Sequence, residues 1–147
     1  MVELDYYESC YQQTFWWHKG LGIISLLVMF INWLFQSFNP VPIPLAGIAQ
    51  WQRKISIIVH LLMNALIVLI GISGYLIVTA KGQGLIVFDW FTIPAVVNNI
   101  VNLEDKAGYS HHIFAYVLIT LVMLHITAAL IHHFVYNDKT LVRIFGQ

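Results

Sequence analysis

The sequence predicts an all-α membrane protein, a bundle of three transmembrane helices. Of its 147 residues, 59% are hydrophobic and only 10% are charged, a composition far more apolar than that of a soluble domain. Three apolar stretches each reach the roughly 20 residues that a helix needs to cross the hydrocarbon core. Tryptophan and tyrosine lie near the ends of these stretches, as is typical of the two interfaces of a bilayer.

The three expected spans lie at about residues 18–37, 55–79 and 109–136, and the whole chain, 1–147, is expected to form a single membrane domain. A loop with three prolines separates the first two spans, because proline cannot continue a helix. A longer loop, 81–108, follows the second span and contains glycine, proline and aromatic residues. Part of this loop is a candidate interfacial helix.

Basic residues indicate how the chain crosses the membrane. Arg53 and Lys54 lie in the loop after the first span, and Lys139 and Arg143 follow the third. The positive-inside rule makes this side cytoplasmic, so we expect the C-terminus in the cytoplasm and the 81–108 loop outside. Seven basic residues are balanced by seven acidic ones, so no net charge points to nucleic acid.

Seven histidines are the unusual feature of this apolar chain, and every one lies in or at the end of an expected span. For a lone membrane histidine, a hydrogen bond inside the bundle is the commoner explanation, because an unengaged polar ring is costly in hydrocarbon. His111 and His125 are 14 residues apart, which places them about 40° apart around one helix and about 21 Å apart along it. Such a pair suits two sites at different depths. The first span crosses in the same direction as the third, so His18 is expected at the depth of His111.

These histidines favour haem over zinc. A haem needs one or two axial ligands, and neutral imidazole is a common one. Zinc needs three or four close ligands, which neither the histidine doublets nor the 14-residue gap provides, and Cys10 is the only cysteine. His18 and His111 are therefore candidate ligands of one iron, and His125 is a candidate ligand at a second site.

Two interpretations stay open for several other residues. His60 is first a core residue and second a ligand or quinone contact. His112 points about 100° away from His111 and is expected beside the site or facing solvent. His132 and His133 are expected at the cytoplasmic interface, near haem propionates, a quinone headgroup or lipid phosphate. Three glycines suit either a porphyrin face or close helix packing: Gly22, Gly71 and Gly74.

Three stretches carry a resemblance to a known family: WHKGLGIISLLV, GISGYLIVTAKGQGLIVFDWFTIP and HHIFAYVLITLVMLHITAALIHHFVYNDKTLVRIF. They resemble the bacterial cytochrome b561 family, small inner-membrane proteins with two b haems, from Trp17 onward. The resemblance implies that His18 and His111 bind the outer haem and that His125 binds the inner one. It also implies electron transfer in the bacterial inner (cytoplasmic) membrane with ubiquinone as a substrate. One type of member oxidises superoxide and passes the electrons to ubiquinone.

The sequence departs from the family at its start. The family has four helices, and the first carries the histidine that partners His125 on the inner haem, whereas this chain begins where the second family helix would begin. Either the chain is shortened at its start, or a partner supplies the extra helix, or the protein holds one haem. Within the chain, His60 is the alternative partner of His125. The family also tends to have an acidic residue at His112 and basic ones near Asn32 and Gln36, a difference that bears on the propionate contacts.

The expected function is that of a membrane b-type cytochrome with one or two haems. Lys19, Lys81 and Lys106 lie near the expected outer surface, where positive charge draws an anion such as superoxide toward the haem edge. The first alternative is a cytochrome b subunit that links a periplasmic dehydrogenase or hydrogenase to quinone. The second is a haem-free membrane scaffold or a histidine-lined proton path.

Overall fold

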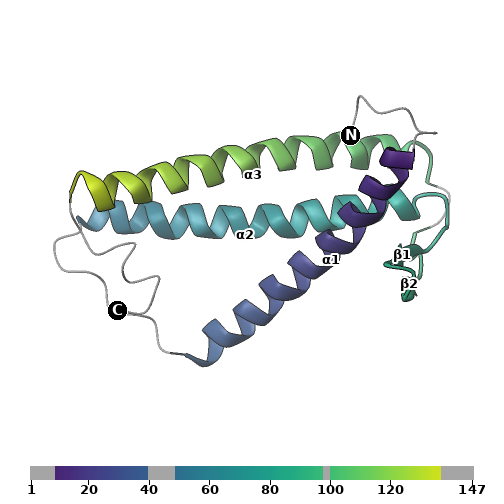
Figure 1. Cartoon of the computed structure of the whole chain (residues 1–147), viewed down its shortest axis with the longest axis horizontal. Helices are drawn as coiled ribbons and strands as arrows, with labels where there is room; N and C mark the ends of the chain where they lie inside the picture. The colour runs from purple at the N-terminus through teal and green to yellow at the C-terminus, as the bar shows by residue number, and fades with distance from the viewer. Residues whose placement is uncertain (1–8, 40–48, 98–99, 137–147) are drawn as a thin grey trace.

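The computed structural model describes residues 9–39, 49–97 and 100–136. Three long helices dominate it: α1 (Ser9–Phe38), α2 (Gln50–Thr79) and α3 (Leu103–Phe134) (Figure 1). All three are long and apolar enough to cross a membrane. Their large apolar side chains lie mostly on the outside, as Phe30, at 55% exposed, illustrates. This is the reverse of a soluble core and is the arrangement a lipid solvent favours, so the predicted helical membrane fold is confirmed.

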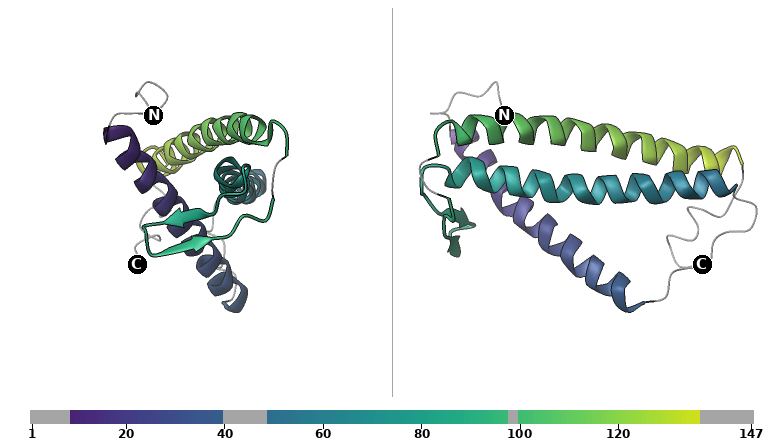
Figure 2. Two further views of the ribbon diagram at one scale, coloured as in Figure 1. Left: turned by 90° about the vertical axis from the view of Figure 1, so that its right-hand side faces the viewer. Right: turned by 180° about the vertical axis from the view of Figure 1, so that it is seen from behind.

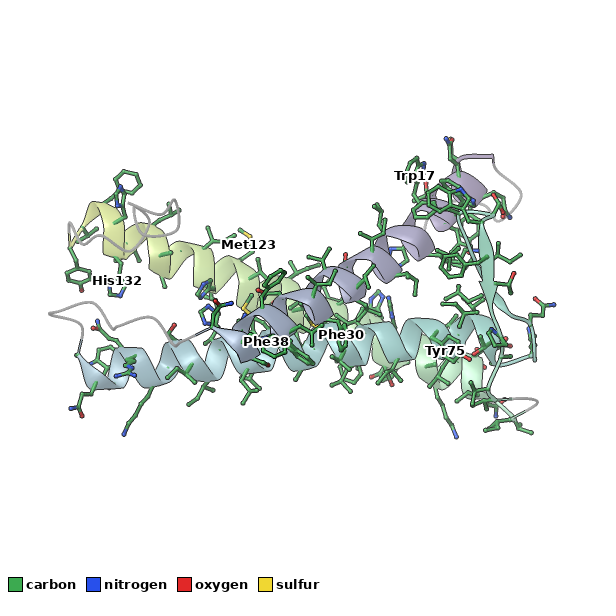
Figure 3. All side chains as sticks on the ribbon, turned by 90° about the horizontal axis from the view of Figure 1, so that it is seen from below. Trp17, Phe30, Phe38, Tyr75, Met123 and His132 are labelled. Atoms are coloured by element: carbon green, nitrogen blue, oxygen red, sulfur yellow. The ribbon has the colours of Figure 1, made fainter. Side chains whose placement is uncertain are left out.

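The helices α2 and α3 run antiparallel and lie side by side along their length, while α1 meets them at one end and then diverges (Figure 1). That end also holds a two-stranded antiparallel hairpin of β1 (Leu85–Val87) and β2 (Phe91–Ile93), which contacts both α1 and α2 (Figure 2). We call it the hairpin end and the opposite one the far end. Figure 3 shows Trp17 toward the hairpin end and His132 toward the far end.

The hairpin corrects one prediction, because in the described part of the 81–108 loop no separate interfacial helix forms. Leu85 pairs with Ile93 and Val87 with Phe91. The helical residues in the described part of this loop, 103–108, belong to the start of α3. The helix α3 therefore begins earlier than expected. Two acidic residues in its first turn favour that start, since they complement the positive end of the helix dipole.

The hairpin turn is unusual in having two large residues in the left-handed region, Phe88 at φ 47° and Asp89 at φ 60°. Contacts with α1 hold this turn. The Trp16 indole Nε1 donates a hydrogen bond to Asp89 Oδ2 at 2.8 Å, and the Phe88 ring packs against the buried Gly20. A Cβ at Gly20 would collide with that ring, so the glycine is what allows the hairpin to lie against the helix.

The chain that leaves the hairpin is fixed to α2 by Tyr75. Its hydroxyl donates to the Pro94 carbonyl oxygen at 2.7 Å and accepts from the Val96 backbone N–H at 2.9 Å. Arg53 and Lys54, near the start of α2, lie at the far end. Lys139 and Arg143, on which the predicted orientation also depends, lie outside the described residues.

Candidate functional site

The hairpin end brings His18 of α1 and His111 of α3 together. Their ring centroids are 5.9 Å apart and the ring planes make an angle of 75°. The two helices cross in the same direction, and this is why residues near the start of each meet at one depth (Figure 1). The predicted proximity of these two imidazoles is confirmed.

The orientation of the His111 ring is fixed by α2. Its Nδ1 lies 3.0 Å from the Ile70 carbonyl oxygen and 3.2 Å from Ser73 Oγ. A carbonyl oxygen only accepts, so the hydrogen-bond network assigns the proton to Nδ1 and leaves Nε2 with a free lone pair. Gly74 makes this approach possible, because a Cβ there would come within 3.2 Å of the ring. An imidazole whose Nδ1–H is engaged in this way can offer its Nε2 lone pair to a metal.

The dimensions of this pair fit a haem. Metal–imidazole bonds are about 2 Å long, so two axial nitrogens on one iron lie about 4 Å apart and their ring centroids about 6 Å apart. The observed centroid distance of 5.9 Å agrees with this value. Gly22, one turn beyond His18, has nothing within 4 Å of its would-be Cβ, which leaves open space for a flat ring. Gly71, by contrast, packs closely against Leu26, so helix packing explains that glycine.

A second pair of imidazoles joins α2 and α3 nearer the far end. His60 and His125 have ring centroids 4.8 Å apart, planes at 62° and Nε2 atoms only 3.4 Å apart. The sequence interpretation left His60 ambiguous, although a signal for the pairing was present. In an antiparallel helix pair that brings Gly74 to His111, stepping back 14 residues on α2 and forward 14 on α3 brings His60 to His125.

Each of the remaining histidines contacts a neighbouring aromatic residue. His112 lies 4.6 Å from the Tyr116 ring, and His132 lies 5.4 Å from the Tyr136 ring. His133 packs beside Phe134, and its Nδ1 is buried with no hydrogen-bond partner among the described residues. Interfacial roles for the last two histidines stay predictions. Across the described residues no three histidine, cysteine, aspartate or glutamate side chains gather around a point.

The lysines of the hairpin end are less available than their charge alone indicates. Lys81 Nζ lies 2.8 Å from Glu104 Oε2, and this hydrogen bond and the carboxylate charge raise the pKa of Lys81. Lys19 Nζ lies 4.7 Å from the centre of the Phe15 ring. Two of the three lysines expected to attract an anion are thus engaged, while the side chain of Lys106 is exposed.

A cleft of about 410 Å³ opens between α1 and α2 where the two helices begin to diverge. Two carboxamides, Asn32 and Asn64, line it from the two sides together with Ser25. The rest of the lining is apolar: Ile24, Val28, Met29 and Ile67. Such a site suits an apolar molecule that carries a few polar atoms.

Three apolar helices that present imidazoles in pairs to one another define a helical membrane protein built to hold a cofactor between its helices. The sequence profile of the family described as prokaryotic cytochrome b561 matches residues 4–147, and the chain belongs to this family. It is similar to cytochrome b561 homolog 2 of Escherichia coli, with 37% identity over 147 residues, which cover all of this chain and 78% of that protein. It is also similar to the probable superoxide oxidase CybB of Yersinia pestis, with 27% identity over 130 residues, 88% of this chain and 73% of that protein.

Family membership makes the chain a membrane b-type cytochrome that takes part in electron transfer, and b-type haem is the cofactor that the family implies. It also makes this a bacterial membrane protein.

Proposed function

We propose that the chain binds haem b between His18 and His111 and transfers single electrons at the hairpin end of the membrane domain. The observation that carries this proposal is the His18–His111 geometry, with centroids 5.9 Å apart and planes at 75°, together with the engaged Nδ1 of His111. A bound b haem supplies reversible one-electron chemistry that the side chains lack.

The residues of the site have separate tasks in this proposal. His18 and His111 provide the two axial nitrogens. The Ile70 carbonyl oxygen accepts from His111 Nδ1–H, which keeps the ring in one orientation and makes its Nε2 a stronger donor. Gly22 leaves the face of α1 open, and the lipid-facing helices keep water away from the rings.

His125 is proposed as a ligand for a second, inner haem, so the cofactor content is one or two haems. In this proposal its axial partner comes from an extra helix, supplied by a partner protein or by a longer form of the chain. Two b haems at different depths would carry an electron across the membrane rather than only along its surface.

For the reaction, we propose superoxide oxidation coupled to ubiquinone reduction. Two superoxide ions become two O₂ and release two electrons, which together with two protons reduce one ubiquinone to ubiquinol. The similarity to the probable superoxide oxidase of Yersinia pestis supports this substrate, and the exposed Lys106 offers positive charge at the hairpin end. The cleft with Asn32 and Asn64 is the proposed quinone site, since carboxamide N–H groups can donate to quinone carbonyls.

We propose the bacterial inner (cytoplasmic) membrane as the location, with the C-terminus in the cytoplasm. Arg53 and Lys54 at the far end support this orientation through the positive-inside rule. The lipid bilayer, quinone and a redox partner protein or extra helix are then the partners.

The alternative function is a cytochrome b subunit that links a periplasmic dehydrogenase or hydrogenase to quinone. Co-purification of a soluble dehydrogenase with the chain, and no reduction by superoxide, would favour it. The second alternative, a haem-free scaffold or proton path, predicts a purified protein without a Soret band.

A haem assay tests the proposal. We expect the pyridine haemochrome of the purified protein to give at least one b haem per chain, and His18→Ala and His111→Ala each to lose the haem at the hairpin end. His125→Ala is the matched control, because it removes a histidine of the same helix 14 residues from His111 and should leave the haem at the hairpin end in place. Haem content and spectrum that stay unchanged in His111→Ala would rule out the assignment.

A further inference from the structure

The helix α2 presents different groups to two imidazoles of α3, those of His111 and His125. Opposite His111 it presents Gly74 and a carbonyl oxygen, so the ring is oriented and its Nε2 stays free. Fourteen residues away along both helices, opposite His125, it presents another imidazole, that of His60. At the depth of His111, α2 therefore leaves the Nε2 of the α3 imidazole free. At the depth of His125, an imidazole of α2 contacts that nitrogen.

Distances show that the His60–His125 pair does not fit a haem iron. Two imidazole nitrogens on opposite sides of one iron lie about 4 Å apart, with ring centroids about 6 Å apart. Here the Nε2 atoms are 3.4 Å apart and the centroids 4.8 Å apart. The contact also joins α2 and α3, which pack side by side along their length, whereas the His18–His111 pair joins α3 to α1, a helix that meets its neighbours at one end and then diverges (Figure 1).

The contact involves the nitrogen through which an imidazole would ligate. A neutral imidazole has one donor and one acceptor nitrogen, so two Nε2 atoms facing each other at 3.4 Å interact when one carries the proton and the other offers its lone pair. In either arrangement the Nε2 of His125 is engaged with His60. It cannot keep this contact and also donate its lone pair to iron.

We propose that His60 closes the second haem position of this chain: its imidazole holds the Nε2 of His125 and must move away before His125 can ligate iron. His60 is thus a positioning residue that competes with the inner haem and is not itself a ligand of its iron. This inference rests on the proposed haem function, yet it concerns a different pair of residues from the one that carries that function.

Haem titration of the haem-free chain in detergent micelles tests the inference. We expect the wild type to bind a first haem tightly, as a low-spin six-coordinate species, and a second one weakly. His60→Leu should tighten the second binding by about 2- to 10-fold, the range that loss of one competing hydrogen bond allows. The second haem should be five-coordinate and high-spin, because His125 is its only axial ligand. Adding His125→Leu to His60→Leu should abolish the gain.

Other results would overturn the inference. If the wild type bound a low-spin second haem that His60→Leu lost, His60 would be an axial ligand. If the affinity for the second haem were the same in both proteins, or neither protein bound a second haem, His60 would have no role in its binding. Failure of the proposed function would be seen in a different variant, since the first haem would then still bind to His18→Leu. A readout without haem is the ¹⁵N spectrum of histidine-labelled protein, in which His60→Leu should shift the His125 Nε2 resonance and leave that of His111 in place.

Discussion

Replacing Gly20 by alanine tests how the hairpin holds α1. The new Cβ would fall on the Phe88 ring, which must then move. That ring makes edge contacts with Trp16 at 4.8 Å and Trp17 at 5.8 Å between centroids. Losing two aromatic contacts of about 0.5–1.5 kcal/mol each, against a helix gain of about 0.5–1 kcal/mol, gives a net loss of about 1 kcal/mol in the free energy of unfolding.

The assay is unfolding of the haem-free protein in mixed micelles, followed by tryptophan fluorescence, since three of the five tryptophans contact the displaced ring. Gly22→Ala is the matched control on the same helix. Nothing lies within 4 Å of its would-be Cβ, so only the helix gain applies and stability should hold or rise. If Gly20→Ala unfolded at the same detergent ratio as Gly22→Ala, with the same emission maximum, the ring would not be held as described.

Three further predictions concern single hydrogen bonds. Trp16→Phe removes the bond to Asp89 and should lower the free energy of unfolding by about 1 kcal/mol, measured in the same assay; no change would mean that the turn is held by packing alone. Ser73→Ala removes the hydroxyl beside His111 Nδ1 and should raise the haem midpoint potential in a redox titration by on the order of 20 mV, while a negative shift would contradict the assigned tautomer. Tyr75→Phe leaves a carbonyl and an N–H of the loop without their partner, so we expect a loss of about 1 kcal/mol and faster amide exchange there; unchanged exchange would argue against this anchor.

The spans and the His18–His111 proximity could be predicted because they depend on few assumptions. Length and composition define a helix that can cross the membrane, and two helices that cross in the same direction place their first residues at one depth. Neither step requires knowing which faces pack. The start of α3 was missed because the apolar run begins later than the helix, whose first turn is polar.

The hairpin could not be predicted because its turn lacks the usual sequence signal. Turns with positive φ are normally made by glycine, asparagine or aspartate, whereas here the first such residue is Phe88, followed by Asp89. Contacts distant in the sequence, from Trp16 and Gly20, stabilise that conformation. The sequence could name His60 only as an alternative partner of His125, since the register of α2 against α3 depends on where Gly74 admits the His111 ring.

The way α1 is held has a consequence for biogenesis. The helix α1 leaves the ribosome before α2 and α3, yet the groups that anchor it, Phe88, Asp89 and His111, are synthesised later. The helices α2 and α3, neighbours in sequence that pack along their length, can enter the bilayer as a helical hairpin. During synthesis α1 must therefore remain in lipid without the residues that contact it in the folded protein. A cofactor that needs both His18 and His111 can bind only after α3 has been made.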